Sequence, residues 1–367
     1  MNAALLARPM LLEPVLVERP WGDQRLARYL GKSLPHGARI GESWETANEA
    51  RVASGPLAGL TLRELVAQFG ADLLGQRGMA ASQPFGDFPL LIKLIDADDV
   101  LSVQVHPDDE QAAALGQRGK TEAWHILAAE PGAELIVGLA ELLDPPALRL
   151  HIASGELPRV LAHLPVQPGD TVIVPAGTLH AIGPGILLYE IQEQSDITYR
   201  FYDWGRVDTQ GRGRPLHIEE GLAVLRPERR AQRTQPLPLD DWRTVLAACR
   251  YFLLERWTIA GQRALTRQPG QTPSILTCLE GTLAIQTDGD ELHLARGETA
   301  LVPASVASLA VAGQATVLAA SVPDLRQDIV IPLRAAGYDE AAIAQLAGDT
   351  GDLARALAAS EPGERRS

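Results

Sequence analysis

Two short stretches, far apart in the sequence, carry side chains that could bind one metal ion. The first holds Gln104 and His106 and is followed by Glu122, and the second, rich in glycine, ends at His180. On a strand, positions 104 and 106 point to the same face, so a single strand can deliver both to one ion. Two imidazoles, a carboxylate and an amide oxygen suit a divalent ion such as zinc and leave a position for water or substrate. We therefore expect a catalytic metal site.

Simpler explanations exist for each of these residues taken alone. A buried histidine beside a hydrogen-bonded glutamine would account for the first stretch, and an exposed ion pair worth at most ~1 kcal/mol would account for Lys120 and Glu122. Their combination with His180 favours a metal site. Lys120 is one of only three lysines, the others being Lys32 and Lys93. If this segment is extended, the Lys120 ammonium and the Glu122 carboxylate enter the same pocket.

The chain beyond the second stretch adds a carboxylate and a guanidinium. Alternation places Glu190 and Gln192 on one face of a strand, and if that face is the interior, Glu190 can move protons as a general acid or base. Arg200 offers a planar set of donors that suits a phosphate. The alternatives are that Glu190 faces outward and that Arg200 forms a structural ion pair with Asp196.

The elements that must hold these residues are mostly strands. Glycine, proline and short β-branched runs recur at close spacing and predict strands at 90–92, 135–137, 172–174, 186–191 and 197–202. Helices are fewer. Thr61 followed by Glu64 is a capping box that predicts a helix start, and 109–116 and 146–163 are further candidates. We expect a mainly β fold with flanking helices.

A diverged internal repeat indicates two related domains. Each copy begins with a glycine, has a proline six positions later after a short apolar run, and ends with a third residue five positions beyond the proline. The first copy has Gly169, Pro175 and His180, and the second has Gly297, Pro303 and Ser308. Because the repeated element occurs twice and serine replaces the ligand histidine in the second copy, we expect two related β-barrels of which only the first binds metal. Chance recurrence in a glycine- and proline-rich chain is the alternative.

The domain borders follow from this repeat and from composition. We expect a catalytic domain over 1–225, a degenerate second domain over 226–325, which a connector at 226–241 begins, and a helical tail over 326–367. The apolar face of the tail should pack on the second domain or on a partner. In the second domain, 280–285 and 292–294 alternate like a hairpin.

Composition limits the possible partners. The 367 residues are 46% hydrophobic and 22% charged, with a net charge of -13. Binding to nucleic acid or to an anionic membrane needs basic surface and is therefore not expected, although a small anionic substrate can still bind a local basic pocket. Only Cys249 and Cys278 occur, and we find no signal peptide, so we expect a reduced, cytoplasmic protein. The oligomeric state stays open.

The motifs resemble a known family, type I mannose-6-phosphate isomerase (phosphomannose isomerase) in its short bacterial form, of the cupin superfamily. Long stretches match in order between about residues 15 and 225, at 19–22, 41–45, 88–109, 119–122, 174–181 and 190–206. The second domain resembles that family only in outline, and the resemblance implies that both β-barrels are cupin-like (jelly-roll). The resemblance implies an enzyme that interconverts mannose 6-phosphate and fructose 6-phosphate with one Zn²⁺ per chain. It places the metal ligands on Gln104, His106, Glu122 and His180, and the pocket residues on Trp21, Lys120, Glu190 and Arg200.

From the resemblance we expect Glu190 to shuttle the proton, with Lys120 as polar assistant or alternative acid. Arg200 should stabilise the enediolate or hold the phosphate, and Trp21, Lys120 and Arg200 should contact substrate. Longer family members carry a histidine just before the lysine, but here that residue is Gly119. The span 123–167 also leaves room for only a small lid. The alternatives are a metal cupin isomerase acting on another sugar or sugar phosphate, and a non-catalytic sugar-phosphate-binding protein.

Overall fold

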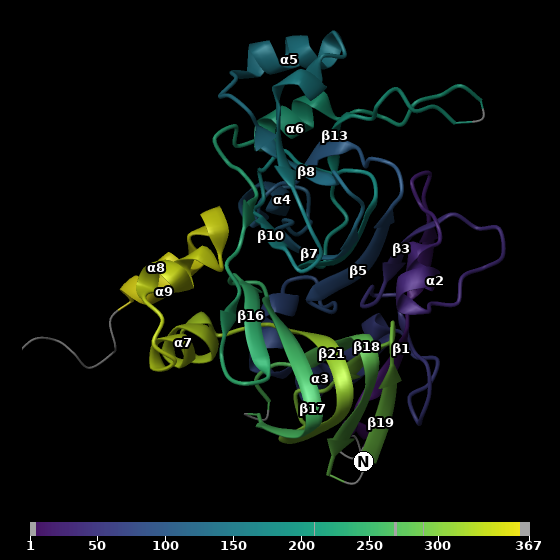
Figure 1. Ribbon diagram of the computed structural model, residues 1–367, viewed down its shortest axis with the longest axis vertical. Coiled ribbons are helices and arrows are strands. Elements are labelled where there is room, and N and C mark those ends of the chain that lie inside the picture. The colour runs from purple at the N-terminus through teal and green to yellow at the C-terminus, as the bar shows by residue number, and fades with distance from the viewer. Residues whose placement is uncertain (1–4, 209, 268–269, 289, 360–367) are drawn as a thin grey trace, which may run out of the picture.

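The protein has two lobes, each built on an antiparallel sheet. A computed structural model describes residues 5–208, 210–267, 270–288 and 290–359. Figure 1 shows one lobe in blue and teal above a second in green, with helices at the edges and the C-terminal helices beside the second sheet. The mainly β prediction with flanking helices is confirmed.

The first sheet carries two of the predicted site residues, Glu122 on β7 and Glu190 on β12. Its seven strands run in the order β14-β10-β7-β12-β5-β3-β2. Their bounds are Gln232–Arg233, Thr171–Val174, Glu122–Ala129, Ile186–Glu193, Leu90–Ala97, Ile40–Trp44 and Val15–Glu18. The central strands β5 and β12 are buried along their whole length, which explains why apolar residues fill both faces there.

Two smaller sheets flank the first. One joins β11 (Ala181–Ile182), β8 (Glu134–Leu139) and β9 (Leu161–Pro165), and the other joins β13 (Tyr199–Tyr202) to β6 (Val103–Val105). In the second of these, Arg200 lies opposite Gln104. This pairing brings the predicted guanidinium segment against the predicted metal-ligand strand, although the two are almost a hundred residues apart in the chain.

The second sheet has nine strands and includes the beginning of the chain. Its order is β15-β16-β17-β21-β18-β20-β1-β4, with β19 paired to β18. The bounds are Leu237–Pro238, Arg243–Ala248, Leu253–Thr266, Ser308–Ser321, Ser274–Thr287, Thr299–Val302, Met10–Glu13 and Arg51–Val52, with β19 at Asp290–Ala295. The predicted hairpin is confirmed as β18 and β19. Closure of the sheets into two barrels and the domain borders stay predictions.

The described helices and helical turns lie at the edges of the sheets. They are α2 (Arg25–Leu30), α3 (Leu62–Ser82), α4 (Asp109–Ala113), α5 (Pro145–Ala153), η1 (Leu157–Val160), α6 (Ile218–Val224), η2 (Leu325–Val330), α7 (Ile331–Ala335), α8 (Glu340–Gln345), η3 (Gly348–Thr350) and α9 (Asp352–Ala358). The capping box predicted at Thr61 is confirmed, since Glu64 N–H donates to Thr61 Oγ1 at 3.2 Å and Thr61 N–H donates to the Glu64 carboxylate at 2.8 Å.

Two helical predictions need correction. The helix expected over 146–163 ends at Ala153, because Gly155 takes a left-handed conformation (φ +73°) and the chain continues into η1 and strand β9. His163 therefore lies on a strand. In the tail, Asp339 caps α8 as expected, but the last helix begins after Gly351 and not after Asp349, which lies within η3.

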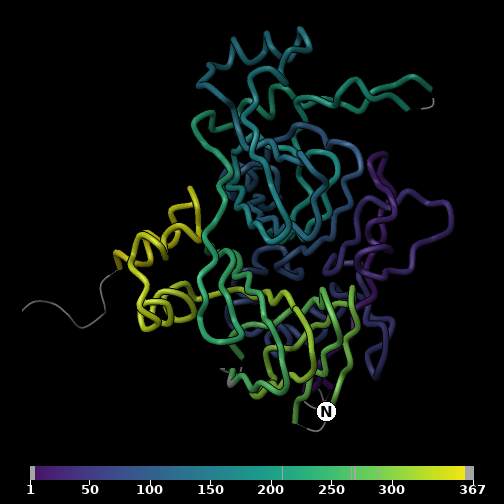
Figure 2. Tube along the Cα trace, in the orientation of Figure 1, coloured from purple at the N-terminus to yellow at the C-terminus, as the bar shows by residue number. Residues whose placement is uncertain are grey.

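The tail packs on the second sheet. Ile329, Leu333, Ile343, Leu346 and Leu353 form a buried cluster with residues of β15, β16 and β17. The Cα trace in Figure 2 shows the same three C-terminal helices alongside this sheet. Residues 360–367 of the predicted tail lie outside the described part of the chain. Cys249 and Cys278 are both buried and form no disulfide.

Among the described residues, no helix is both long and apolar enough to span a membrane.

Candidate active site

Three predicted metal ligands converge in the interior of the first lobe. His106 follows β6, Glu122 opens β7, and His180 pairs with Gln104 through two backbone hydrogen bonds of 3.0 and 2.9 Å. One Glu122 oxygen lies 3.8 Å from His106 Nε2, and the other lies 3.3 Å from His180 Nε2. The ligand atoms of these three residues all lie within 4.8 Å of one another, and all three side chains are buried.

The protonation of the two histidines suits metal binding. His106 Nδ1 lies 2.7 Å from the Ile197 carbonyl, and His180 Nδ1 lies 2.8 Å from the Thr178 carbonyl. A carbonyl only accepts, so each Nδ1 carries the hydrogen and each Nε2 presents a lone pair toward Glu122. Burial lowers the pKa of His106 well below its usual range and that of His180 to about 4, so both rings are neutral.

Glu122 provides the clearest test of whether a cation fits. Both of its oxygens are buried and accept no hydrogen bond of normal geometry among the described residues. Burial raises the pKa of Glu122, and the Lys120 ammonium, 2.9 Å from Oε2, offsets part of that rise. A buried carboxylate with free lone pairs, facing two imidazole nitrogens, is the donor set that a divalent cation would satisfy.

Gln104 and Lys120 complete this group. The Gln104 side-chain nitrogen lies 3.4 Å from His180 Nε2, and because amide nitrogen and oxygen are assigned from hydrogen bonding, the oxygen can equally occupy this position. Lys120 Nζ lies 3.2 Å from His106 Nε2, so one ammonium contacts both the imidazole and the carboxylate. Burial opposes its charge, but Glu122 and Glu190 raise the pKa of Lys120 above its ordinary value.

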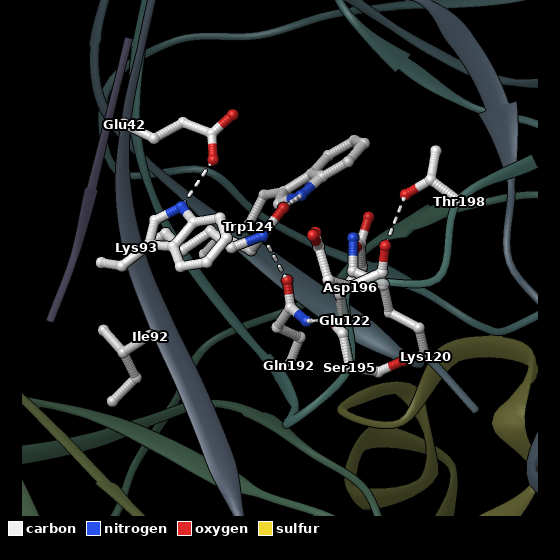
Figure 3. A network of polar contacts seen from close by, with 12 residues as sticks. Glu42, Ile92, Lys93, Lys120, Glu122, Trp124, Gln192, Ser195, Asp196 and Thr198 are labelled. Carbon is white, nitrogen blue, oxygen red and sulfur yellow. Dashed lines mark hydrogen bonds and ion pairs between the residues drawn. The ribbon is translucent and has the colours of Figure 1, made fainter. Parts of the chain in front are cut away.

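A second buried carboxylate lies beside this group. Strand register places Glu190 opposite Lys93, and Figure 3 shows the Lys93 ammonium reaching toward Gln192. Lys93 Nζ is 3.1 Å from Glu190 Oε1 and 2.8 Å from Gln192 Oε1, while Trp124 Nε1 donates to Glu190 Oε2 at 2.9 Å. Burial would raise the pKa of Glu190, but Lys93 and Lys120 hold it below its usual range. Glu190 is therefore an ionised interior carboxylate.

Arginine side chains gather around Trp21 beside this group. Trp21 is surrounded by arginines, with the guanidinium carbons of Arg19, Arg206 and Arg214 at 5.8, 5.8 and 5.2 Å from its ring centre. Arg200 lines the same cavity as Trp21, and burial together with Arg214 lowers its pKa.

Arg200 is free to act on a ligand. No ion pair joins it to Asp196 among the described residues, and its guanidinium donates to the Pro215 carbonyl at 3.0 Å. The alternative of a structural pair with Asp196 is therefore not what the structure shows.

One cavity of about 320 Å³ is lined by residues of both groups. It is lined by the predicted residues Trp21, Gln104, Lys120, Glu190 and Arg200, and by Arg19, Glu42, Lys93, Asp196 and Arg214, which were not predicted as site residues. Lys93 gave one overlooked signal, since it is the single basic residue of β5, whose other residues are apolar except Asp96. Arg19 lies in the family-matching stretch 19–22, which was a signal for it, and Arg214 lies in a loop and gave none.

The backbone around Gly119, the residue before Lys120, leaves no room for a side chain. A β-carbon at this position would lie 2.5 Å from the Asp109 backbone nitrogen. The Gly119 N–H donates to Asp109 Oδ1 at 3.1 Å, and the Tyr251 hydroxyl donates to Asp109 Oδ2 at 2.7 Å. The start of α4 and a residue of the second lobe thus hold the segment that leads to Lys120.

Fold and site together define a cupin-type protein whose first lobe has a buried His–Glu–His group that could hold a metal ion. Residues 10–131 match the family model "Phosphomannose isomerase type I, catalytic domain", and residues 243–322 match "Mannose-6-phosphate isomerase, cupin domain".

Individual relatives agree with these matches. A mannose-6-phosphate isomerase of Streptococcus mutans is 35% identical over 321 residues, covering 86% of this chain and 98% of the relative. The mannose-6-phosphate isomerase ManA of Bacillus subtilis is 38% identical over 275 residues, covering 72% and 84%. A crystal structure of the Bacillus subtilis mannose 6-phosphate isomerase superposes with a TM-score of 0.76 at 30% identity, covering 85% and 99%. The chain belongs to the mannose-6-phosphate isomerase family and is an isomerase.

Proposed function

We propose that this isomerase is zinc-dependent and interconverts mannose 6-phosphate and fructose 6-phosphate through an enediol(ate). One observation carries the proposal: a single cavity is lined by Gln104 and Lys120 beside the His–Glu–His group, by the ionised Glu190, and by Arg19, Arg200 and Arg214. A sugar phosphate has a matching polarity, with a carbonyl and hydroxyls at one end and a dianion at the other.

A zinc ion held by Gln104, His106, Glu122 and His180 would polarise the oxygens at C1 and C2 of the sugar and stabilise negative charge that develops there. The four side chains offer nitrogen and oxygen donors of the kind zinc accepts, and both imidazoles are already oriented by backbone carbonyls.

The remaining pocket residues take separate roles. Glu190, ionised and held by Lys93 and Trp124, moves the proton between C2 and C1 as a general base and then acid. Lys120 is the polar assistant and the alternative acid. Arg200 lines the cavity together with Arg19 and Arg214, and its guanidinium can hold the phosphate or stabilise the enediolate. Trp21 forms the wall against which the substrate lies.

Two other functions compete with this one. An isomerase of another sugar phosphate would bind its phosphate with the same arginines, whereas an isomerase of free sugars would leave these arginines without a ligand. A non-catalytic binding protein would not need an ionised Glu190. We favour isomerisation of mannose 6-phosphate because both family matches name that activity. In addition, arginines and residues beside the His–Glu–His group line the same cavity.

The test combines metal analysis with a coupled isomerase assay. The purified protein should contain about one zinc per chain, lose turnover of mannose 6-phosphate on chelation and regain it with zinc. Free mannose should be turned over far more slowly. Full activity of the metal-free protein, or equal use of free mannose, would refute the proposal.

A variant tests the base. Glu190→Gln keeps the shape of the side chain but cannot take up the proton, so kcat should fall by about 10²–10⁴-fold while zinc content stays near one per chain. Glu45→Gln is the matched control, because Glu45 is an equally buried, lysine-paired carboxylate away from the cavity. If kcat of Glu190→Gln remains close to that of the Glu45 variant, the base lies elsewhere.

A further inference from the structure

The second lobe contains a cavity that the isomerase site does not use. Its volume is about 660 Å³, roughly twice that of the catalytic cavity at about 320 Å³. Strands β16, β17 and β21 form one side, and residues of η2 and α7 in the tail form the other. Figures 1 and 2 show these tail helices beside the open edge of the sheet. Both family matches end by residue 322, so the tail wall lies beyond them.

A buried carboxyl without a cationic partner faces this cavity. Glu255 and Trp257 are two residues apart on β17, so they project from the same face. The Trp257 indole N–H donates to Glu255 Oε2 at 3.2 Å. No other hydrogen bond or ion pair reaches Glu255 from the described part of the chain, although it is 9% exposed. A buried carboxyl with spare acceptor capacity is costly unless something binds it.

The cationic residues around the cavity are already engaged. Arg243 pairs with Asp240 at 2.8 Å, and Arg77 pairs with Asp328. Arg267 donates to three backbone carbonyls, those of Thr272, Pro303 and Val306 at 2.7, 3.0 and 3.2 Å. An anionic ligand would therefore have to displace existing partners, which disfavours a sugar phosphate at this position.

Neutral polar groups remain free. Ser321 ends β21 and Ser274 begins β18, the neighbouring strand, and both line the cavity. Neither hydroxyl has a hydrogen-bond partner among the described residues, so each can donate or accept. The cavity thus offers one strong acceptor and two hydroxyls, which matches a ligand that carries both donors and acceptors and no net charge.

We propose that this cavity binds a neutral mono- or disaccharide. Sugar hydroxyls would donate to Glu255 and exchange hydrogen bonds with Ser274 and Ser321, while the partly exposed Leu239 and Leu265 of the lining supply apolar surface for the carbon side of the ring. The volume lies within the range of about 300–1,000 Å³ usual for small-molecule sites. The C-terminal tail then has a function, because α7 closes one side of the site.

The experiment measures binding of D-mannose, D-fructose and sucrose to the zinc-loaded protein by isothermal titration and ligand-observed NMR. We expect at least one sugar to bind with a Kd on the order of 1 mM or tighter. Glycine serves as a small zwitterionic probe and should not bind.

Three variants test whether the sugar binds in this cavity, and none of them removes buried side-chain volume. Ala335→Phe fills the cavity from the exposed side of α7, and should weaken the bound sugar at least about tenfold. Ala341→Phe is the matched control, because Ala341 is an exposed alanine of the same tail that does not line the cavity, and its Kd should stay within about twofold. Glu255→Gln keeps an acceptor but loses the charge, and should weaken binding about fivefold.

Turnover of mannose 6-phosphate reports that each variant is folded, since none of these residues lies in the catalytic cavity. The proposal is overturned if no sugar of the panel binds below about 10 mM. It is equally overturned if glycine binds in place of the sugars, or if Ala335→Phe and Ala341→Phe bind the sugar equally well.

Discussion

The ion pair between Lys93 and Glu190 allows the interior electrostatics to be tested directly. Both side chains are about 95% buried or more, and their charged atoms lie 3.1 Å apart. With an effective dielectric constant of ~20, Coulomb attraction at that distance is ~5 kcal/mol, which sets a ceiling. Desolvation of both ions reduces the net value, and removing one partner of such a pair typically costs about 3–5 kcal/mol. We therefore expect Lys93→Met to lower the free energy of unfolding by about 3 kcal/mol.

Glu190→Gln removes the charge that Lys93→Met leaves without a partner. The double variant Lys93→Met/Glu190→Gln should lose less free energy of unfolding than the two single variants lose together, which gives a coupling energy of about 2–4 kcal/mol. The assay is urea unfolding of the four proteins at pH 7.5, with kcat measured in parallel. Because Lys93 is the main group that lowers the pKa of Glu190, the acid limb of the kcat/KM profile of Lys93→Met should move to higher pH.

A second buried pair supplies the control. Lys32 lies 2.8 Å from Glu45, and both are buried outside the catalytic cavity. Lys32→Met should cost a comparable free energy of unfolding and leave kcat and its pH profile unchanged. Additive costs in the Lys93 cycle, with coupling below about 0.5 kcal/mol, would show that the pair contributes nothing beyond its parts. An unmoved acid limb would show that Glu190 does not set it.

Three further predictions concern the strand and loop that carry the metal-binding group. Burial lowers the pKa of His125 to about 4, so the unfolded chain binds more protons between pH 6.5 and 4, and His125 alone should contribute ~2 kcal/mol to the loss of stability from pH 7.5 to pH 5, in addition to the losses from His106 and His180; His125→Gln should remove its part of the loss in urea unfolding, whereas the exposed His163→Gln should not. Gly119→Ala should cost about 1–3 kcal/mol and lower zinc affinity, measured by competition with a chromogenic chelator, because its β-carbon would meet the α4 backbone at 2.5 Å. Tyr251→Phe should weaken zinc binding several-fold with a change in Tm of only a few degrees, because it removes one hydrogen bond, at 2.7 Å, to the aspartate that holds this loop; unchanged zinc affinity would show that the second lobe does not position the site.

Local chemistry explains why parts of the fold were predictable. The Thr61–Glu64 capping box and the Asp339 cap formed as expected, because a cap depends on residues within one turn. The strand predictions at 90–92, 172–174 and 186–191 lie inside observed strands. The helix prediction at 146–163 failed where Gly155 turned the chain and β9 gained strand partners, since pairing with β8 is a tertiary effect that outweighs local preference.

The site shows the same division. Gln104, His106, Glu122 and His180 could be proposed from types, spacing and family resemblance, because a strand fixes which side chains share a face. Lys93, Arg19 and Arg214 could not, because each belongs to the site only through packing against distant segments. The same holds for the cavity of the second lobe, whose walls come from a sheet and from a tail that follows it in the chain.

By itself, the sequence determined which donors are available, their spacing along strands and the family to which those motifs point. Only the tertiary structure decided the charge states and the partners. Burial neutralises His106 and His180, while Lys93 keeps Glu190 ionised, and these opposite outcomes depend on how far each group lies from water and from the nearest opposite charge. The order of the residues does not determine the distance of a group from water or from the nearest opposite charge, because both distances arise only when strands remote in the chain pair side by side.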